Sequence, residues 1–131
     1  MRDQTIYLPP ESYQQEVEQF YEEKRGSNPA LLDAFLYFEE EFNEVADLFY
    51  GDFWSTEPLN RTKESIDRLS LAKELADVMF TLYGVAITAG INLDVAFQLV
   101  CDSNMTKERT PEGKVQKGES YIEPDMTEAL L

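Results

Sequence analysis

Apolar residues recur at helical spacing along most of this 131-residue chain. Residues 30–50 give the clearest case, because their apolar side chains fall in a stripe about 100° wide around a helix, as in a helix that packs along one side. Shorter patterns of the same kind cover residues 12–25 and 92–105. In the stretch 64–89 the pattern differs, since residues 78–89 are apolar on nearly every side. We therefore expect four helices, with the third in the centre of the fold.

Helix-ending residues separate these stretches. The turn from Gly26 to Pro29 closes the first helix, and residues 51–63 form a connector rich in turn-forming residues. Gly90 ends the third helix, and Asn92 can cap the fourth. The boundaries of all four predicted helices thus rest on local backbone chemistry as well as on periodicity.

The end of the chain is a different kind of segment. Residues 107–117 hold four of the eleven basic residues, while Pro111, Gly113 and Gly118 prevent long regular structure. No run in the chain alternates apolar and polar residues strictly enough to require a strand. With 43% hydrophobic residues the chain is long enough for one domain with a real core. The predicted fold class is all-α: a four-helix bundle with an irregular C-terminal segment, forming a single domain over residues 1–131.

Two pairs of acidic residues lie inside the two most apolar stretches: Glu41 with Glu44, and Glu74 with Asp77. Residues three apart are neighbours on a helix surface, so two such pairs facing each other would form a cage of four carboxylates. An all-oxygen cage suits Mg²⁺, Mn²⁺ or Ca²⁺ rather than zinc. A solvated helix face explains either pair alone equally well, and it is the better interpretation for Glu40, which points away from the expected core.

Composition excludes several classes of function. The net charge of −15, from 26 acidic and 11 basic residues, argues against nonspecific binding to nucleic acids or anionic membranes. The chain has no histidine and a single cysteine, Cys101, which removes disulfides, zinc fingers and Ser-His-Asp or Cys-His catalytic groups. A di-iron carboxylate bundle would need Glu-x-x-His, and neither acidic pair has the loop pattern of an EF-hand.

Targeting signals are not evident. Residues 1–10 lack the basic start and apolar run of a signal peptide, and no apolar stretch reaches the roughly 18 residues of a membrane span. The expected location is the cytoplasm.

The basic segment has two interpretations. Lys107, Arg109, Lys114 and Lys117 are concentrated in an otherwise acidic protein, where they could bind the phosphates of a polyanionic substrate held by metal ions. Because glutamates are interleaved with them, composition alone favours a solvated tail.

The order of these motifs resembles a known family. The acidic motifs are Glu40-Glu41-Phe42-Asn43-Glu44 and Glu74-Leu75-Ala76-Asp77, and the later ones are Ser103-Asn104-Met105-Thr106-Lys107, Glu112-Gly113-Lys114 and Lys117-Gly118-x-x-Tyr121-x-x-Pro124. Together they resemble the all-α nucleoside triphosphate pyrophosphohydrolases, the MazG-like superfamily that includes phosphoribosyl-ATP pyrophosphohydrolase-like proteins. The matched regions extend over about residues 12–125.

The resemblance implies hydrolysis of a nucleoside triphosphate between its α and β phosphates, giving the monophosphate and pyrophosphate. It implies Mg²⁺, with Mn²⁺ as an alternative, bound by Glu41, Glu44, Glu74 and Asp77. Glu40 would act beside Glu41, either by orienting a ligand or water or by helping to activate the attacking water.

The resemblance also implies a set of substrate contacts. Asn104 and Lys107 correspond to substrate-contacting positions, and Lys114, Lys117 and Tyr121 to a segment that can close over the phosphates. The 29 residues between Glu44 and Glu74 depart from the compact pattern of the family. In this connector Phe53 or Trp54 could stack on a nucleobase or simply cover the core.

Alternatives stay open at this point. Phosphoribosyl-ATP pyrophosphohydrolase shares the expected scaffold and the bond cleaved, and a non-catalytic helical interaction module would leave the acids as plain surface. The family forms dimers or tetramers. The apolar third helix fits that pattern, since three short helices cannot easily cover it, and we expect a homodimer or homotetramer.

Overall fold

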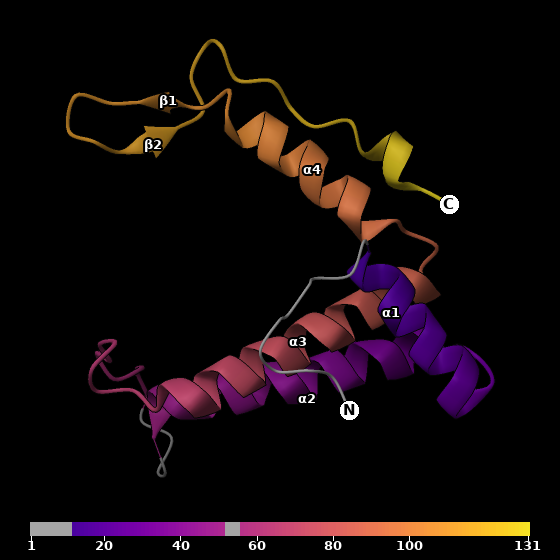
Figure 1. The fold of residues 1–131 in the computed structure, drawn as a ribbon. Helices are drawn as coiled ribbons and strands as arrows, with labels where there is room; N and C mark the ends of the chain where they lie inside the picture. Colours follow the sequence, from indigo (N-terminus) through magenta and orange to yellow (C-terminus); the bar gives the residue numbers. More distant parts are fainter. Residues whose placement is uncertain (1–11, 52–55) are drawn as a thin grey trace, which may run out of the picture. The chain divides into compact units, whose positions relative to one another are not determined.

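Helices make up most of the chain that the structure describes, residues 12–51 and 56–131 of a computed structural model. The order of elements is α1 (Tyr13–Phe20), the π-helical turn η1 (Tyr21–Arg25), α2 (Leu31–Tyr50), α3 (Arg68–Thr88), α4 (Leu93–Asn104), β1 (Glu108–Arg109), β2 (Val115–Gln116) and the 3₁₀ helix η2 (Met126–Ala129) (Figure 1). They divide into two compact units, Met1–Ala89 and Gly90–Leu131. The all-α fold class predicted from the sequence is confirmed.

Side-chain caps begin three of the four α-helices. Ser12 Oγ accepts the backbone N–H of Gln15 at 3.2 Å at the start of α1. The predicted cap of α4 is confirmed, because Asn92 Oδ1 accepts the N–H of Val95 at 3.2 Å. At the first helix's other end Gly26 has a φ of +83°, a left-handed conformation that glycine adopts without strain.

The third helix starts later than the sequence pattern predicted. We expected it from residue 64, but α3 begins at Arg68. Thr62 and Ser65 instead close a turn of their own, in which Ser65 Oγ accepts the N–H of Thr62 at 2.8 Å and Thr62 Oγ1 accepts that of Ser65 at 3.2 Å. Asp67 then caps α3. Hydroxyl groups that bind nearby backbone N–H groups compete with helix formation, which explains the shorter helix.

In the first unit α2 and α3 lie side by side as an antiparallel pair (Figure 1). Each helix buries a small residue: Ala34 of α2 is 1% exposed and Ala86 of α3 is 4% exposed. The far end of α2 is held by Arg61, whose Nε donates to the carbonyl oxygen of Leu48 at 3.2 Å. This bond gives a partner to one of the carbonyl groups in the last turn of α2, which have no hydrogen-bond partner within the helix.

The helix α3 also contacts α1 and η1. Val17, Tyr21 and Tyr83 are buried at this contact, and the Phe20 ring meets the Phe80 ring edge-on at 5.1 Å between centroids. Gly84 makes the close approach possible: a Cβ at this position would overlap the hydroxyl of Tyr21. Burial raises the pKa of that hydroxyl, as expected for a phenol held against a helix.

In the second unit the end of the chain returns along α4. The backbone N–H of Asn92 donates to the carbonyl of Ala129 at 2.7 Å, and the N–H of Leu131 donates to that of Gly90 at 2.8 Å. Near the C-terminus of α4, Ser103 Oγ donates to the Ile122 carbonyl at 2.6 Å. The segment expected to be irregular therefore has fixed contacts, and within it β1 and β2 form a short antiparallel hairpin that the sequence did not predict.

None of the helices in the described ranges combines the length and the apolar character needed to cross a membrane.

Candidate metal centre

The pairing of α2 with α3 brings four carboxylates together. Glu41 and Glu44 extend from α2, Glu74 and Asp77 from α3, and one oxygen of each lies within 4.8 Å of the others. All four side chains are half-buried. Since each pair is spaced i, i+3, both members lie on the surface that its helix presents to the other. The two pairs predicted from the sequence thus face each other, as a cage requires.

Two oxygens of this cluster have no partner. Glu41 Oε2 and Glu74 Oε2 are buried from solvent and form no hydrogen bond. A buried carboxylate oxygen without a hydrogen bond or a cation is costly, because it has lost its hydration without compensation. The donor set is all oxygen and carries several negative charges, which suits a hard divalent cation. The residues present therefore fit a divalent metal ion.

Glu44 and Glu74 meet across the two helices. A hydrogen bond between their carboxyl groups raises the pKa of Glu74, and burial raises it further, while the Lys73 ammonium group acts in the opposite direction. Two carboxyl groups can form such a hydrogen bond only if one of them is protonated. The raised pKa means that Glu74 takes up a proton more readily than a free glutamate does, and this uptake would relieve part of the repulsion in the cluster.

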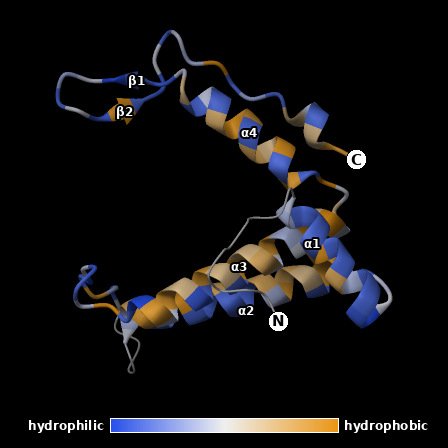
Figure 2. Ribbon diagram, viewed as in Figure 1, coloured by the Kyte–Doolittle hydropathy of each residue, from blue (hydrophilic) through white to orange (hydrophobic). Residues whose placement is uncertain are grey.

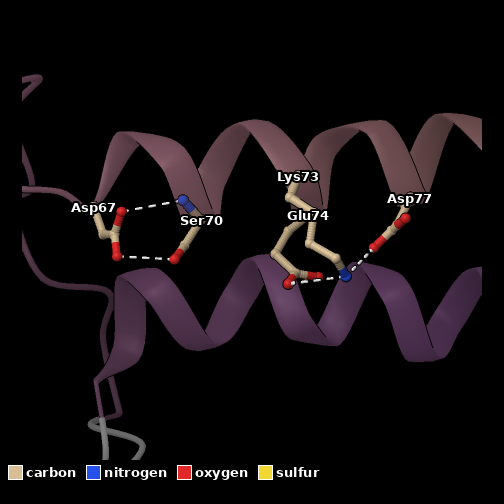
Figure 3. A network of polar contacts seen from close by, with 5 residues as sticks. All are labelled: Asp67, Ser70, Lys73, Glu74 and Asp77. Atoms are coloured by element: carbon tan, nitrogen blue, oxygen red, sulfur yellow. Dashed lines mark hydrogen bonds and ion pairs between the residues drawn. The ribbon is translucent and has the colours of Figure 1, made fainter. Parts of the chain in front are cut away.

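A lysine next to the cluster was not among the predicted site residues. Lys73 Nζ lies 2.6 Å from Asp77 Oδ2 and 3.8 Å from Glu74 Oε1, although its side chain is 70% exposed (Figure 3). The hydrogen bond to Asp77 is the main reason that the pKa of Lys73 is raised. Its sequence position one residue before Glu74 and four before Asp77 is the signal that could have indicated this contact.

The first turn of α3 is fixed just before these residues. Asp67 Oδ1 accepts the N–H of Ser70 at 3.1 Å, and Asp67 Oδ2 accepts the Ser70 hydroxyl at 2.8 Å (Figure 3). These bonds lower the pKa of Asp67. Since Glu74 follows Ser70 by one helical turn, the cap helps to fix the helix that carries half of the cluster.

Two further predicted site residues, Glu40 and Trp54, are not assigned to this cluster. Glu40 is exposed on α2 and is not one of the four acids that converge. Trp54, together with Phe53, lies outside the described residues.

The remaining predicted residues belong to the second unit. Asn104 is the last residue of α4 and accepts, through its carbonyl, the backbone N–H of Lys107 at 3.1 Å. Lys114 closes the hairpin, where its N–H donates to Thr110 Oγ1 at 3.0 Å. These contacts use only backbone atoms of Lys107 and Lys114, so the ammonium groups of the two lysines take no part in them.

Lys117 and Tyr121 lie together in the same unit. Lys117 Nζ is 4.8 Å from the centre of the Tyr121 ring and 3.4 Å from Glu123 Oε1. The carboxylate of Glu123 is the main cause of the raised pKa of Lys117. The two predicted residues are thus neighbours, and the ammonium group of Lys117 is occupied by an internal carboxylate.

One comparison with known proteins covers the part of the chain that holds the cluster. The family model described as phosphoribosyl-ATP pyrophosphohydrolase matches residues 10–104, which include both acidic motifs and α4. A search of curated proteins gave no match.

Proposed function

We propose, because the chain belongs to the phosphoribosyl-ATP pyrophosphohydrolase family of the MazG-like all-α superfamily, that it is a Mg²⁺-dependent nucleoside triphosphate pyrophosphohydrolase. Membership makes it a pyrophosphohydrolase, an enzyme that acts on acid anhydrides. The substrate is proposed to be a canonical or damaged (deoxy)nucleoside triphosphate, cleaved between the α and β phosphates. The role would be control of the nucleotide pool in the cytoplasm.

One observation carries the proposal: four carboxylates from two helices converge within 4.8 Å, and two of their oxygens are buried without partners. Surface acids would spread apart and stay hydrated, so this cluster is better explained as a cation site. We assign Glu41, Glu44, Glu74 and Asp77 as the ligands. Mg²⁺ is the proposed ion and Mn²⁺ its alternative; when bound, such an ion offsets charge on phosphate oxygens and lowers the pKa of coordinated water.

The chain's own residues then have distinct proposed roles. Water attacks the α phosphorus while the bond from that phosphorus to the bridging oxygen breaks, and the bridging oxygen leaves with pyrophosphate. Glu40, exposed and adjacent to Glu41, is proposed to accept the proton that the water loses. Glu41 would keep the water oriented through its place in the cluster.

Substrate contacts are proposed from the C-terminal motif: Asn104, Lys107, Lys114, Lys117 and Tyr121, with Trp54 for the base. The lysines would offset charge on the departing pyrophosphate. Lys117 is paired with Glu123 at 3.4 Å, so its ammonium group would exchange this carboxylate for a phosphate of the substrate.

The assembly is proposed to be a homodimer or homotetramer of one-domain chains, without nucleic acid or membrane partners. The family match supports one domain, since it continues from the first unit into α4 of the second. The net charge of −15 supports the absence of polyanionic macromolecular partners.

A substrate panel tests the function. The protein is incubated with each common ribo- and deoxynucleoside triphosphate and with phosphoribosyl-ATP in Mg²⁺, and the products are separated. We expect monophosphate and pyrophosphate without orthophosphate, and no turnover in excess chelator. In water labelled with ¹⁸O the label should appear in the monophosphate, because attack is at the α phosphorus. Orthophosphate as the product, or no turnover of any substrate, would contradict the proposal.

Phosphoribosyl-ATP is the second candidate substrate, favoured by the description of the matching family. It carries the same α–β bond, so the panel distinguishes it by relative kcat/KM alone.

Two variants test the proposed metal ligands in the same panel. Asp77→Asn and Glu41→Gln keep the size of each side chain and remove one ligand charge, so we expect turnover to be abolished while the helical circular dichroism is unchanged. Near-normal activity in either variant would remove the metal role assigned to that residue.

A further inference from the structure

Lys73 is the basic residue that contacts the carboxylate cluster directly. Its Nζ lies 2.6 Å from Asp77 Oδ2 and 3.8 Å from Glu74 Oε1 (Figure 3). We propose that the Lys73 ammonium group is a built-in counter-cation of this cluster, which a divalent ion must displace, so that Lys73 sets the affinity of the site for metal. The inference rests on the proposed function, since it takes the cluster to be the metal site.

The placement of Lys73 neutralises one side of the cluster only. It contacts the two acids of α3, yet one oxygen on each helix, Glu41 Oε2 and Glu74 Oε2, stays buried without a hydrogen bond. A single ammonium group on α3 therefore relieves part of the repulsion among four acids and leaves the rest. A divalent ion placed among all four would relieve more of it, which favours exchange.

The Lys73 ammonium group can also leave the cluster easily. Its side chain is 70% exposed, so the ammonium group can move into solvent without crossing the protein. Ion pairs with such exposed lysines are weak, and displacing one costs little. After the exchange the ammonium group would stay tethered next to the ion, and its positive charge would repel that ion. The loss of the ion pair and this repulsion both make metal binding weaker with Lys73 than without it.

An ordinary surface ion pair is the competing explanation. Lys73 and Asp77 are spaced i, i+4, and such pairs form on many helices without any function. That explanation predicts no effect of Lys73 on metal affinity beyond the general effect of removing one positive charge from the protein.

Calorimetric titration with Mn²⁺ alone separates the two explanations. The full chain without nucleotide is compared with Lys73→Met, with Lys73→Arg, and with Lys24→Met, which removes the same charge from an exposed position of η1. At constant pH and ionic strength we expect Lys73→Met to bind Mn²⁺ about two- to fivefold more tightly, the range that an exposed ion pair supports. Lys73→Arg should stay closer to the unchanged protein, because it keeps the charge.

A second readout uses stability in place of affinity. In chelator, Lys73→Met should melt at a lower temperature than the unchanged protein, because the acids lose their internal cation, and it should gain more on addition of Mn²⁺. Equal shifts in Lys73→Met and Lys24→Met would overturn the role of Lys73 while leaving the metal site in place. No Mn²⁺ binding by the unchanged protein would overturn the metal site itself, and the role of Lys73 with it.

Discussion

Glu74 interacts with both a neighbouring acid and a neighbouring lysine of the cluster. It shares a hydrogen bond with Glu44, its Oε2 is buried without a partner, and Lys73 lies 3.8 Å from its Oε1. The hydrogen bond that protonated Glu74 donates to Glu44 and the loss of hydration both favour the protonated form of Glu74, so the folded protein binds this proton more tightly than the unfolded chain does. Stability and metal binding should therefore both depend on pH through Glu74.

The sign of that dependence follows from the raised pKa. Below the ordinary value of 4.5 the shared proton is fully bound and its contribution to stability is complete; it is lost as the pH rises through the raised pKa of the folded state. In chelator, we expect the melting temperature to fall as the pH rises above 4.5, more steeply in the unchanged protein than in Glu74→Gln. Addition of Mg²⁺ should stabilise the unchanged protein more at pH 7 than at pH 5, because the ion binds the deprotonated acid.

The control for this pH series is Glu39→Gln, which removes one charge from an exposed position of α2 outside the cluster. It should keep the steep dependence of the unchanged protein. The loss of stability at very low pH is a separate effect, because the lowered pKa values of Asp67 and Asp125 act below 3.8. A Glu74→Gln series parallel to that of the unchanged protein would show that the shared proton contributes nothing.

At this scale the sequence predicted which acids meet and missed how they are neutralised. The i, i+3 spacing and the apolar setting were enough to select Glu41, Glu44, Glu74 and Asp77, because helical periodicity fixes the face of each side chain. The contact of Lys73 and the raised pKa of Glu74 depend on side-chain conformations and on the facing helix. Neither is encoded in the spacing of residues along one helix.

Among the elements, α3 is the one that links the parts of the first unit. It contacts α2 at the cluster and, further along the helix, α1 and η1, where Tyr21 lies against Gly84. The sequence indicated Gly90 and Asn92 as the end of one helix and the cap of the next, and both are confirmed. It placed the start of α3 too early, since apolar periodicity cannot show that Thr62 and Ser65 close a separate turn.

The contact of α1 with α3 gives a prediction at the scale of elements. Gly→Ala in an exposed helix adds about 1 kcal/mol of stability, yet at Gly84 the new Cβ would overlap the Tyr21 hydroxyl. We expect Gly84→Ala to lower the free energy of unfolding by about 1–3 kcal/mol, the usual cost of overpacking, as measured by urea denaturation. Tyr21→Phe removes the overlapping atom, so the double variant should recover part of the loss.

Metal binding provides the control for this experiment, because the cluster lies between α2 and α3 and makes no use of α1. Gly84→Ala should therefore bind Mn²⁺ as the unchanged protein does wherever it is folded. A variant more stable than the unchanged protein would show that Tyr21 moves aside without cost.

At the scale of the whole molecule, the first unit leaves large apolar side chains of both α2 and α3 exposed. Leu31, Phe35 and Phe42 of α2 are 45–54% exposed, and Leu75, Met79 and Leu82 of α3 are exposed as well. Figure 2 shows apolar positions, in orange, along both helices. The sequence predicted that the third helix had more apolar sides than its neighbours could cover, and this exposure fits that expectation. Periodicity could indicate the uncovered faces but not the division into two units, which depends on contacts between distant residues.

The exposed apolar faces lead to a test of the proposed assembly. Apolar stripes of this kind are covered in water by another surface, and a second copy offers the same stripes in return. We expect sedimentation velocity at micromolar concentration to show a dimer or tetramer, and Phe35→Glu to shift it toward the monomer, because a charge in a covered apolar stripe loses its hydration. Gln15→Glu adds the same charge at an exposed polar position of α1 and should leave the assembly unchanged. An unchanged protein that sediments as a monomer throughout this range would contradict the proposed oligomer, while Phe35→Glu sedimenting like the unchanged oligomer would place the interface on another face.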